Sequence, residues 1–363
     1  MADTKVYLSG GRIQGRSDDS VTTQDAIAQT SWKELDRVTL GSAGDVLDCN
    51  GSGSGFTAKD NLMILIIGHK SGNAQIEDLT FNGDTGSNYA RRYSENGSSS
   101  TETSQDSIQF GIDSEDDEFA VITVRNTADK EKLLIGHTIA RGSTGAGYIG
   151  NRLEVAGKWA NTSNQITRVT LTNPHDGNLD TGSEMVILGC DDDEADSGTN
   201  FWGELGSNTL TAEGDVLTTT IAAKKYLMVD IHPTSNSSNT SNNPDYNLTF
   251  NGATSGYAGR SSQNGGSDGT FSSGAFINGW LGYQDRFVKA YVINVASKEK
   301  MAIGHDNAVG NSGFGAGTAP QRNEWVGKWA NTSDSITTVT STNSSARPST
   351  YGVGASIRVW GSN

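Results

Sequence analysis

The 363-residue chain has little cysteine and no long apolar run. Its two cysteines, Cys49 and Cys190, exclude a disulfide-rich scaffold and form no Cys-x-x-Cys motif for zinc or redox chemistry. We expect both to be small buried residues, with a single bridge between neighbouring strands as the alternative. No apolar stretch approaches the roughly 20 residues of a membrane-spanning helix, and no signal-peptide core follows the first residues. The sequence therefore predicts a soluble protein that is not exported through a signal peptide.

Positive charge and histidine are also scarce. The 27 Lys and Arg residues face 42 Asp and Glu residues, and the net charge of −15 excludes nucleic acid and anionic membranes as partners. The 5 histidines form no zinc-ligand spacing, and His137 and His305, which both follow Ile-Gly, are expected to make structural hydrogen bonds. No G-x-S-x-G elbow or phosphate-binding loop occurs. We therefore predict no enzymatic activity, no cofactor and no metal.

An internal repeat divides the chain. Fifteen of the 22 residues at 152–173 recur 170 positions later at 322–343, among them the string Gly-Lys-Trp-Ala-Asn-Thr-Ser. Shorter matches at similar offsets occur throughout both halves. The predicted segments are an N-terminal arm at 1–30 with a helical turn near Thr23 to Gln29, a first repeat at 31–189, an acidic linker at 190–200 and a second repeat at 201–363.

The fold class follows from the abundant residues and their alternation. The 45 glycines are spread among Ser and Asn in turn-like clusters, and no apolar stripe of helical period lies between them. Instead apolar residues alternate at period two, as Leu227, Val229 and Ile231 do. The sequence predicts an all-β fold of two tandem homologous antiparallel β-sandwich domains, jelly-roll-like, that follow the arm.

One face of the first repeat differs from its counterpart in the second. Two strands of the first repeat are apolar on both faces, as covered strands are, whereas their equivalents carry Asp230 and Arg358. First and last strands are neighbours in a jelly roll, so we expect one patch that packs on another subunit or a particle, with the second repeat facing outward. A loop of the same chain that covers this face is the alternative. The predicted assembly interface consists of Leu65, Ile67, Val186 and Leu188.

Charged residues favour structural roles. The acidic run at 113–118 has no acidic counterpart in the second repeat, which predicts a solvated loop. Glu154 lies near Arg152, and the pair recurs as Glu324 near Arg322. Glycoside hydrolysis needs only two carboxylates, but retained acids beside retained bases favour ion pairs over catalysis.

Aromatic residues fall into two groups. Trp32, Trp159, Trp202 and Trp329 occupy equivalent positions in the two repeats, which predicts packing roles. A second group belongs to the second repeat alone and, if exposed, would suit stacking on a sugar ring or a protein contact; repacking of that domain's core is the alternative. These candidate glycan or partner contacts are Trp280, Tyr283 and Trp325.

Several strings resemble a known group of proteins. SWKELDRVTL at 31–40, LTFNGDTGSNY at 79–89 and the repeated GKWANTS are similar to repeated domains in virion structural proteins of tailed phages and marine prokaryotic viruses. The resemblance covers both repeats but not the arm, and its motifs are structural. It implies a capsid decoration, head fibre, spike or tail-associated protein on the particle exterior. It further implies a symmetric homo-oligomer, with a trimer favoured, that docks through the arm on the major capsid protein or tail.

The sequence therefore predicts a non-enzymatic virion structural protein whose first domain docks in the assembly and whose second faces outward. The alternative is a glycan- or receptor-binding module that attaches the particle to a host surface. An enzyme such as a capsule depolymerase is the third possibility.

Overall fold

The computed structural model describes most of both repeats and two short pieces of the arm. The described residues are 7–8, 12–13, 31–71, 78–112, 117–175, 177–192, 200–234, 246–277, 286–308, 319–343 and 350–363. In the arm, β1 (Tyr7–Leu8) pairs with β2 (Arg12–Ile13). The helical turn expected near Thr23 to Gln29 lies outside the described residues. Within the described ranges, no helix has the length and apolar character needed to cross a membrane.

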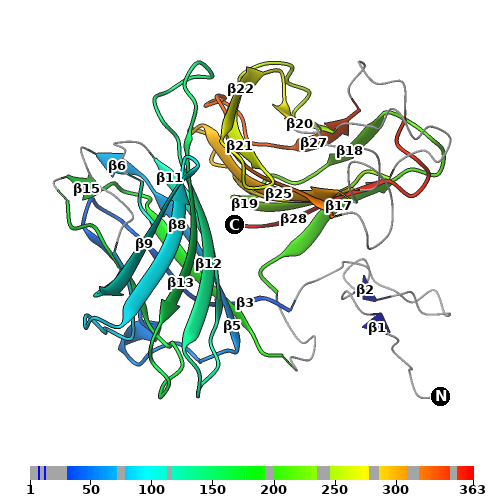
Figure 1. The fold of residues 1–363 in the computed structure, drawn as a ribbon. Coiled ribbons are helices and arrows are strands. Elements are labelled where there is room, and N and C mark those ends of the chain that lie inside the picture. Colours follow the sequence, from blue (N-terminus) through cyan, green and yellow to red (C-terminus); the bar gives the residue numbers. More distant parts are fainter. Residues whose placement is uncertain are drawn as a thin grey trace, which may run out of the picture.

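Domain 1 is a sandwich of two antiparallel sheets (Figure 1). The larger sheet has eight strands in the spatial order β3 (Lys33–Thr39), β16 (Glu184–Cys190), β5 (Asn61–Gly68), β11 (Glu118–Arg125), β12 (Lys132–Ala140), β13 (Asn151–Trp159), β8 (Tyr89–Glu95) and β9 (Ser98–Gln105). The smaller has four, in the order β10 (Ile108–Gln109), β7 (Asp78–Phe81), β14 (Val169–Thr172) and β4 (Val46–Cys49). A ribbon of β6 (Lys70–Ser71) with β15 (Asn178–Leu179) and a short 3₁₀ turn, η1 (Gly51–Gly53), complete the domain.

Domain 2 repeats the same strand order. Its larger sheet runs β17 (Gly203–Thr209), β28 (Ser356–Ser362), β19 (Tyr226–His232), β24 (Arg286–Ile293), β25 (Lys300–Ala308), β26 (Gln321–Trp329), β21 (Tyr257–Gln263) and β22 (Gly269–Ser273). Its smaller sheet runs β18 (Val216–Thr220), β27 (Thr338–Thr342), β20 (Asn247–Phe250) and β23 (Phe276–Ile277). The predicted fold class, two tandem antiparallel β-sandwiches, is confirmed.

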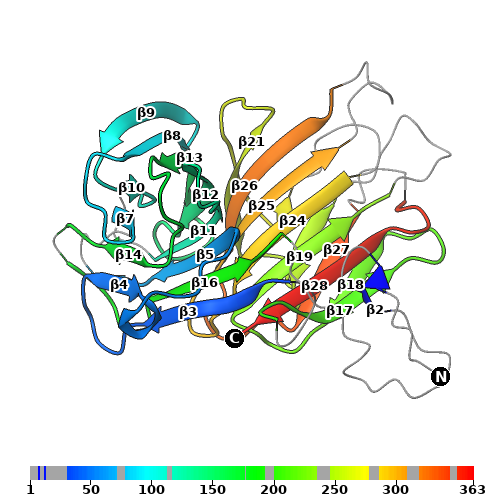
Figure 2. The same ribbon diagram turned by 90° about the horizontal axis from the view of Figure 1, so that it is seen from below.

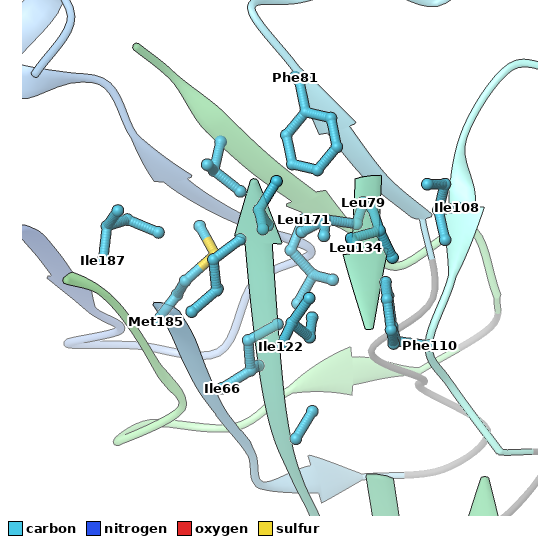
Figure 3. Packing of buried hydrophobic residues seen from close by; sticks show 14 of the residues in the cluster. Ile66, Leu79, Phe81, Ile108, Phe110, Ile122, Leu134, Leu171, Met185 and Ile187 are labelled. Atoms are coloured by element: carbon cyan, nitrogen blue, oxygen red, sulfur yellow. The ribbon is translucent and has the colours of Figure 1, made fainter. Parts of the chain in front are cut away.

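Each sandwich encloses its own apolar core between the larger and the smaller sheet. In domain 1, Ile66 and Ile122 of the larger sheet lie in one cluster with Leu79 and Leu171 of the smaller sheet (Figure 3). The alternation seen in the sequence creates this core, because every second side chain of a strand points to the same face. Domain 2 has an equivalent cluster between its own two sheets.

Two of the repeated tryptophans close equivalent ends of these cores. The Trp159 ring lies parallel to that of Tyr89, with centroids 6.3 Å apart, and Trp329 stacks on Tyr257 in the same way at 6.0 Å. Both indoles are buried. The other two repeated tryptophans, Trp32 and Trp202, pack into the contact between the domains. The predicted packing roles are therefore confirmed.

The two domains are joined face to face through their larger sheets (Figure 2). Equivalent strands meet, since β12 lies against β25 and β13 against β26. A third apolar cluster fills the contact, and we call it the interdomain core. Its buried members are Met63, Leu65, Ile67, Phe119, Val121, Ile139, Val186, Leu188, Phe201, Trp202, Tyr226, Met228, Ile293, Met301, Ile303, Val326 and Trp360.

The interdomain core corrects the predicted assembly interface. The apolar patch on β5 and β16 is covered as expected, and Val186 pairs with Leu65 in the sheet. What covers it, however, is the second repeat of the same chain, so neither another subunit nor a particle reaches it. The equivalent face of domain 2 is not exposed to solvent either, because Tyr226, Met228 and Trp360 are buried there. The predicted assembly interface is therefore wrong for all four of its residues. They are Leu65, Ile67, Val186 and Leu188, and each is fully buried.

Several acidic residues outside this core are paired rather than solvated. Glu118, which closes the acidic run, forms an ion pair with Lys70 at 2.7 Å, and both side chains are fully buried. The prediction of a solvated loop is therefore wrong for Glu118. Residues 113–116 of the same run lie outside the described part of the chain. In the linker, Asp191 pairs with Lys59 at 2.8 Å. No disulfide bridge links Cys49 to Cys190.

We predict that Leu65→Ala lowers the free energy of unfolding by about 3 kcal/mol, because it removes a fully buried side chain from the interdomain core. The matched control is Leu133→Ala on β12, whose side chain is 59% exposed and whose loss should change stability by less than about 0.5 kcal/mol. Urea unfolding of the full chain measures both. Equal effects of the two variants would contradict the burial of the β5 face.

Candidate functional site

The polar centre of the interdomain contact is a pair of equivalent histidines. His137 on β12 and His305 on β25 face each other with their Nε2 atoms 3.1 Å apart and their ring centroids 4.2 Å apart. One Nε2–H donates and the other Nε2 accepts, so at least one of the two rings is the Nε2–H tautomer. The structural hydrogen bond expected at these positions is therefore present, and it joins the two repeats.

The Ile-Gly-His sequence explains how each histidine reaches this contact. Gly136 and Gly304 point into the sandwich cores, where a Cβ would lie 2.2 Å from the Phe110 ring and 2.1 Å from the Trp325 ring. Only glycine fits beneath these aromatic rings. Because side chains alternate along a strand, the next residue, histidine, points to the opposite face and toward the other domain.

Each histidine has a glutamate directly across from it on the neighbouring strand. Glu154 on β13 is registered with His137, and Glu324 on β26 is registered with His305. The ligand atoms of His137, Glu154 and His305 all lie within 4.8 Å of one another. The carboxyl groups of Glu324 and Glu154 both contact Nη1 of Arg152. We call these four residues the histidine–glutamate cluster.

An arginine of domain 1 borders the cluster and reaches into domain 2. Arg152 is 2% exposed, and its Nη2 donates to Asp268 Oδ1 at 2.6 Å. Its Nη1 pairs with Glu154 and lies 3.6 Å from Glu324 Oε2. Arg322, the equivalent residue of domain 2, is 59% exposed and contacts Glu324 from outside at 3.1 Å. The ion pairs expected between these acids and bases are confirmed, but just one of the two arginines is buried.

Burial controls the protonation of the cluster. It raises the pKa of Glu154 to about 7, and the hydrogen bond with Glu324 adds to this effect. Burial also lowers the pKa of His137 well below its usual value, with further contributions from His305 and Arg152. The pKa of His305 is lowered by burial as well. Near neutral pH, the cluster thus contains two neutral imidazoles and a partly protonated Glu154 carboxyl group.

The arrangement suits proton sharing or metal ligation. Imidazole nitrogens and carboxylate oxygens are the ligands that borderline divalent metals bind, and His137, Glu154 and His305 converge from the two domains. The group is therefore a candidate cation or proton site at the interdomain contact.

Two further polar contacts outside the cluster join the domains. Glu184 of domain 1 is buried and accepts a hydrogen bond from the Tyr226 hydroxyl at 2.6 Å, and it also pairs with Lys225 at 2.9 Å. Asp117 of domain 1 is buried and pairs with Lys298 at 3.3 Å. Both carboxylates thus have partners from the opposite repeat, which satisfies their charges within the contact.

The predicted glycan or partner contacts do not gather into a described site. Trp325 is 2% exposed, and its ring stacks on Phe276 with centroids 5.6 Å apart, so it cannot stack on a sugar. Its role is the alternative, repacking of the domain 2 core: it fills the space above Gly304 that Phe110 fills above Gly136. Trp280 and Tyr283 lie outside the described residues.

Sequence reasoning noticed the members of the cluster but not their association. The repeat places the same His and Glu types in both copies, and this signal was available. The pairing of His137 with Glu154, and of His305 with Glu324, depends on strand register. Their convergence depends further on the contact between domains, which no local spacing encodes.

Comparisons with known proteins identify no family. No protein-family model and no curated protein matches the chain. The solved structures include the binding domain of botulinum neurotoxin serotype D/C, with 8% identity over 84% of this chain and 92% of that chain and a TM-score of 0.15. They also include human GIVD cytosolic phospholipase A2, with 10% identity over 84% of this chain and 33% of that chain and a TM-score of 0.11. Likenesses this weak carry no argument about function.

We predict that Arg152→Met destabilises the protein by about 3 kcal/mol, because it leaves Asp268 buried without its main partner. Arg322→Met is the matched control at the equivalent position of the second repeat, and we expect a change within about 0.5 kcal/mol because that side chain is largely exposed. Chemical denaturation compares the two. An effect of Arg322→Met as large as that of Arg152→Met would contradict the asymmetry of the cluster.

We also predict a stability loss in acid that depends on Asp117. Burial alone would raise the pKa of this carboxyl, but its interactions with His69 and the charges of Lys298 and Arg141 outweigh burial and hold that pKa at about 2. Its folded pKa is below the unfolded value near 3.9, so its contribution is complete above about pH 4 and disappears as the pH falls to 2.

Asp117→Asn removes this titration. Between pH 4 and pH 2, the wild-type protein should therefore lose about 2 kcal/mol more of its unfolding free energy than the variant does. Urea titrations at several pH values measure the difference. Parallel pH profiles of the two proteins would show that Asp117 does not carry the acid sensitivity.

Proposed function

We propose that the chain is a non-enzymatic structural protein of a virus particle and that it lies on the particle exterior. The observation that carries this proposal is the structural role of the residues that recur in both repeats. Those that recur in both copies form the two sandwich cores, as Trp159 and Trp329 do, or the contact between domains, as His137 and His305 do. Residues devoted to folding and to joining two sandwiches are what a particle component requires.

The strings that resemble repeated domains of virion proteins support the same proposal. They lie in these structural elements: SWKELDRVTL extends along β3, and GKWANTS begins at the end of β13 and β26. Partners would be other copies of the chain, with a trimer favoured, and virion proteins such as the major capsid protein or tail. Because domain 2 occupies the outer face of β5 and β16, we now assign docking to the arm, residues 1–30, rather than to this face.

We propose that the fused pair of domains acts as one spacer. In this proposal the arm docks on the particle and the two-domain body faces outward. The boundary between the docked and outward parts therefore does not fall between domain 1 and domain 2. A continuous apolar layer of this kind resembles a permanent subunit contact more than a transient one.

The test is electron microscopy of purified particles with an antibody against this chain. We predict label on the particle exterior for the full chain and loss of label after deletion of residues 1–30. A thermal melt of the shortened protein that matches the full chain serves as the folding control. Particles that carry no label would contradict the virion location, and unchanged label after the deletion would contradict docking through the arm.

A glycan array run on the same two proteins separates this proposal from the glycan-binding alternative. The structural role predicts no glycan binding by the full chain. Binding that disappears in Trp280→Ala would favour host attachment instead.

A further inference from the structure

The histidine–glutamate cluster has a geometry that its hydrogen bonds alone do not require. Its members come as two equivalent pairs, His137 with Glu154 and His305 with Glu324, and each pair lies on the outer face of a larger sheet. Outer-face residues are not needed for the core of their own sandwich. Both copies nevertheless place the same two ligand types where the sheets meet.

The spacing of the two imidazoles matches that of two ligands on one metal ion. Tetrahedral zinc, with bonds of about 2.0 Å to each imidazole, places its two ligand nitrogens roughly 3.3 Å apart. The Nε2 atoms of His137 and His305 are 3.1 Å apart. Two bonds to one ion therefore require little movement of either ring.

The glutamates can supply the remaining ligands. A Glu154 oxygen lies within 4.8 Å of both histidine nitrogens. Glu324 is registered with His305 on the neighbouring strand, and its Oε2 lies 3.6 Å from the Arg152 Nη1 that also contacts Glu154. His137, His305 and Glu154 would supply two nitrogens and one oxygen, and Glu324 or water would supply the fourth ligand of a tetrahedral site.

The positive charges of the two arginines near the cluster are compatible with the binding of a cation. Arg152 borders the glutamates, but Asp268, 3% exposed and 2.6 Å away, balances its charge. Arg322 is largely exposed to solvent, which weakens its interaction with Glu324.

We propose that the histidine–glutamate cluster binds one divalent transition-metal ion of the zinc class and that this ion links domain 1 to domain 2. The mixed nitrogen and oxygen ligands select zinc and its neighbours over magnesium and calcium, which prefer oxygen alone. The proposal goes beyond the particle role and does not depend on it. A metal shared between the repeats stabilises the folded chain, since the ligands are brought together only in the folded state.

Isothermal titration of the full, tag-free chain with zinc chloride tests the proposal. We expect one zinc ion per chain and a rise of a few degrees in the midpoint of thermal unfolding, with no such rise in magnesium chloride. His137→Gln and His305→Gln should each weaken zinc binding at least tenfold. His232→Gln, which changes an exposed histidine outside the cluster, should bind zinc as the wild type does.

Circular dichroism of every variant without zinc establishes that it is folded. If one histidine variant does not fold, the other and Glu154→Gln, which keeps the size of the side chain, carry the same test. A wild-type chain that binds no zinc would overturn the proposal, as would undiminished binding by the folded variants. Equal stabilisation by magnesium would exclude the nitrogen ligands and contradict it as well.

Discussion

The architecture depends on the burial of two sheet faces against each other. Each larger sheet has a second apolar face, and neither could remain in water without a large exposed apolar patch. Packing one on the other buries Leu65 and Val186 of domain 1 with Tyr226 and Met228 of domain 2. The two sandwiches thus share a third core, and the contact resembles the interior of one protein more than a transient interface.

Polar groups within this contact are matched across the domains. Glu184 meets Tyr226 and Lys225, and Arg152 meets Asp268, so each buried charge has a partner from the other repeat. Such pairs add little net stability but penalise any other arrangement of the two sheets, because displacement would leave a buried charge unpaired. They fix the relative position of the domains, and that position brings His137 to His305.

Much of the fold was predictable because strands, turns and repeats are local signals. Alternation identified the strands, and the match of 152–173 with 322–343 identified two copies of one domain. The pattern also showed that Leu65 lies on a covered face, since burial determines which residues a position tolerates. It did not identify what covers that face, because any apolar partner imposes the same pattern. The sequence leaves Trp325 open between a surface contact and core packing, because its burial depends on the space above Gly304, which the strand pattern does not reveal.

The central claim is that the interdomain core makes the two sandwiches unfold together. Differential scanning calorimetry of the wild-type chain tests it most directly, because the ratio of the calorimetric to the van't Hoff enthalpy counts the cooperative units. We predict one transition with a ratio of about one. Two separate transitions, each with the enthalpy of a single sandwich, would contradict the account.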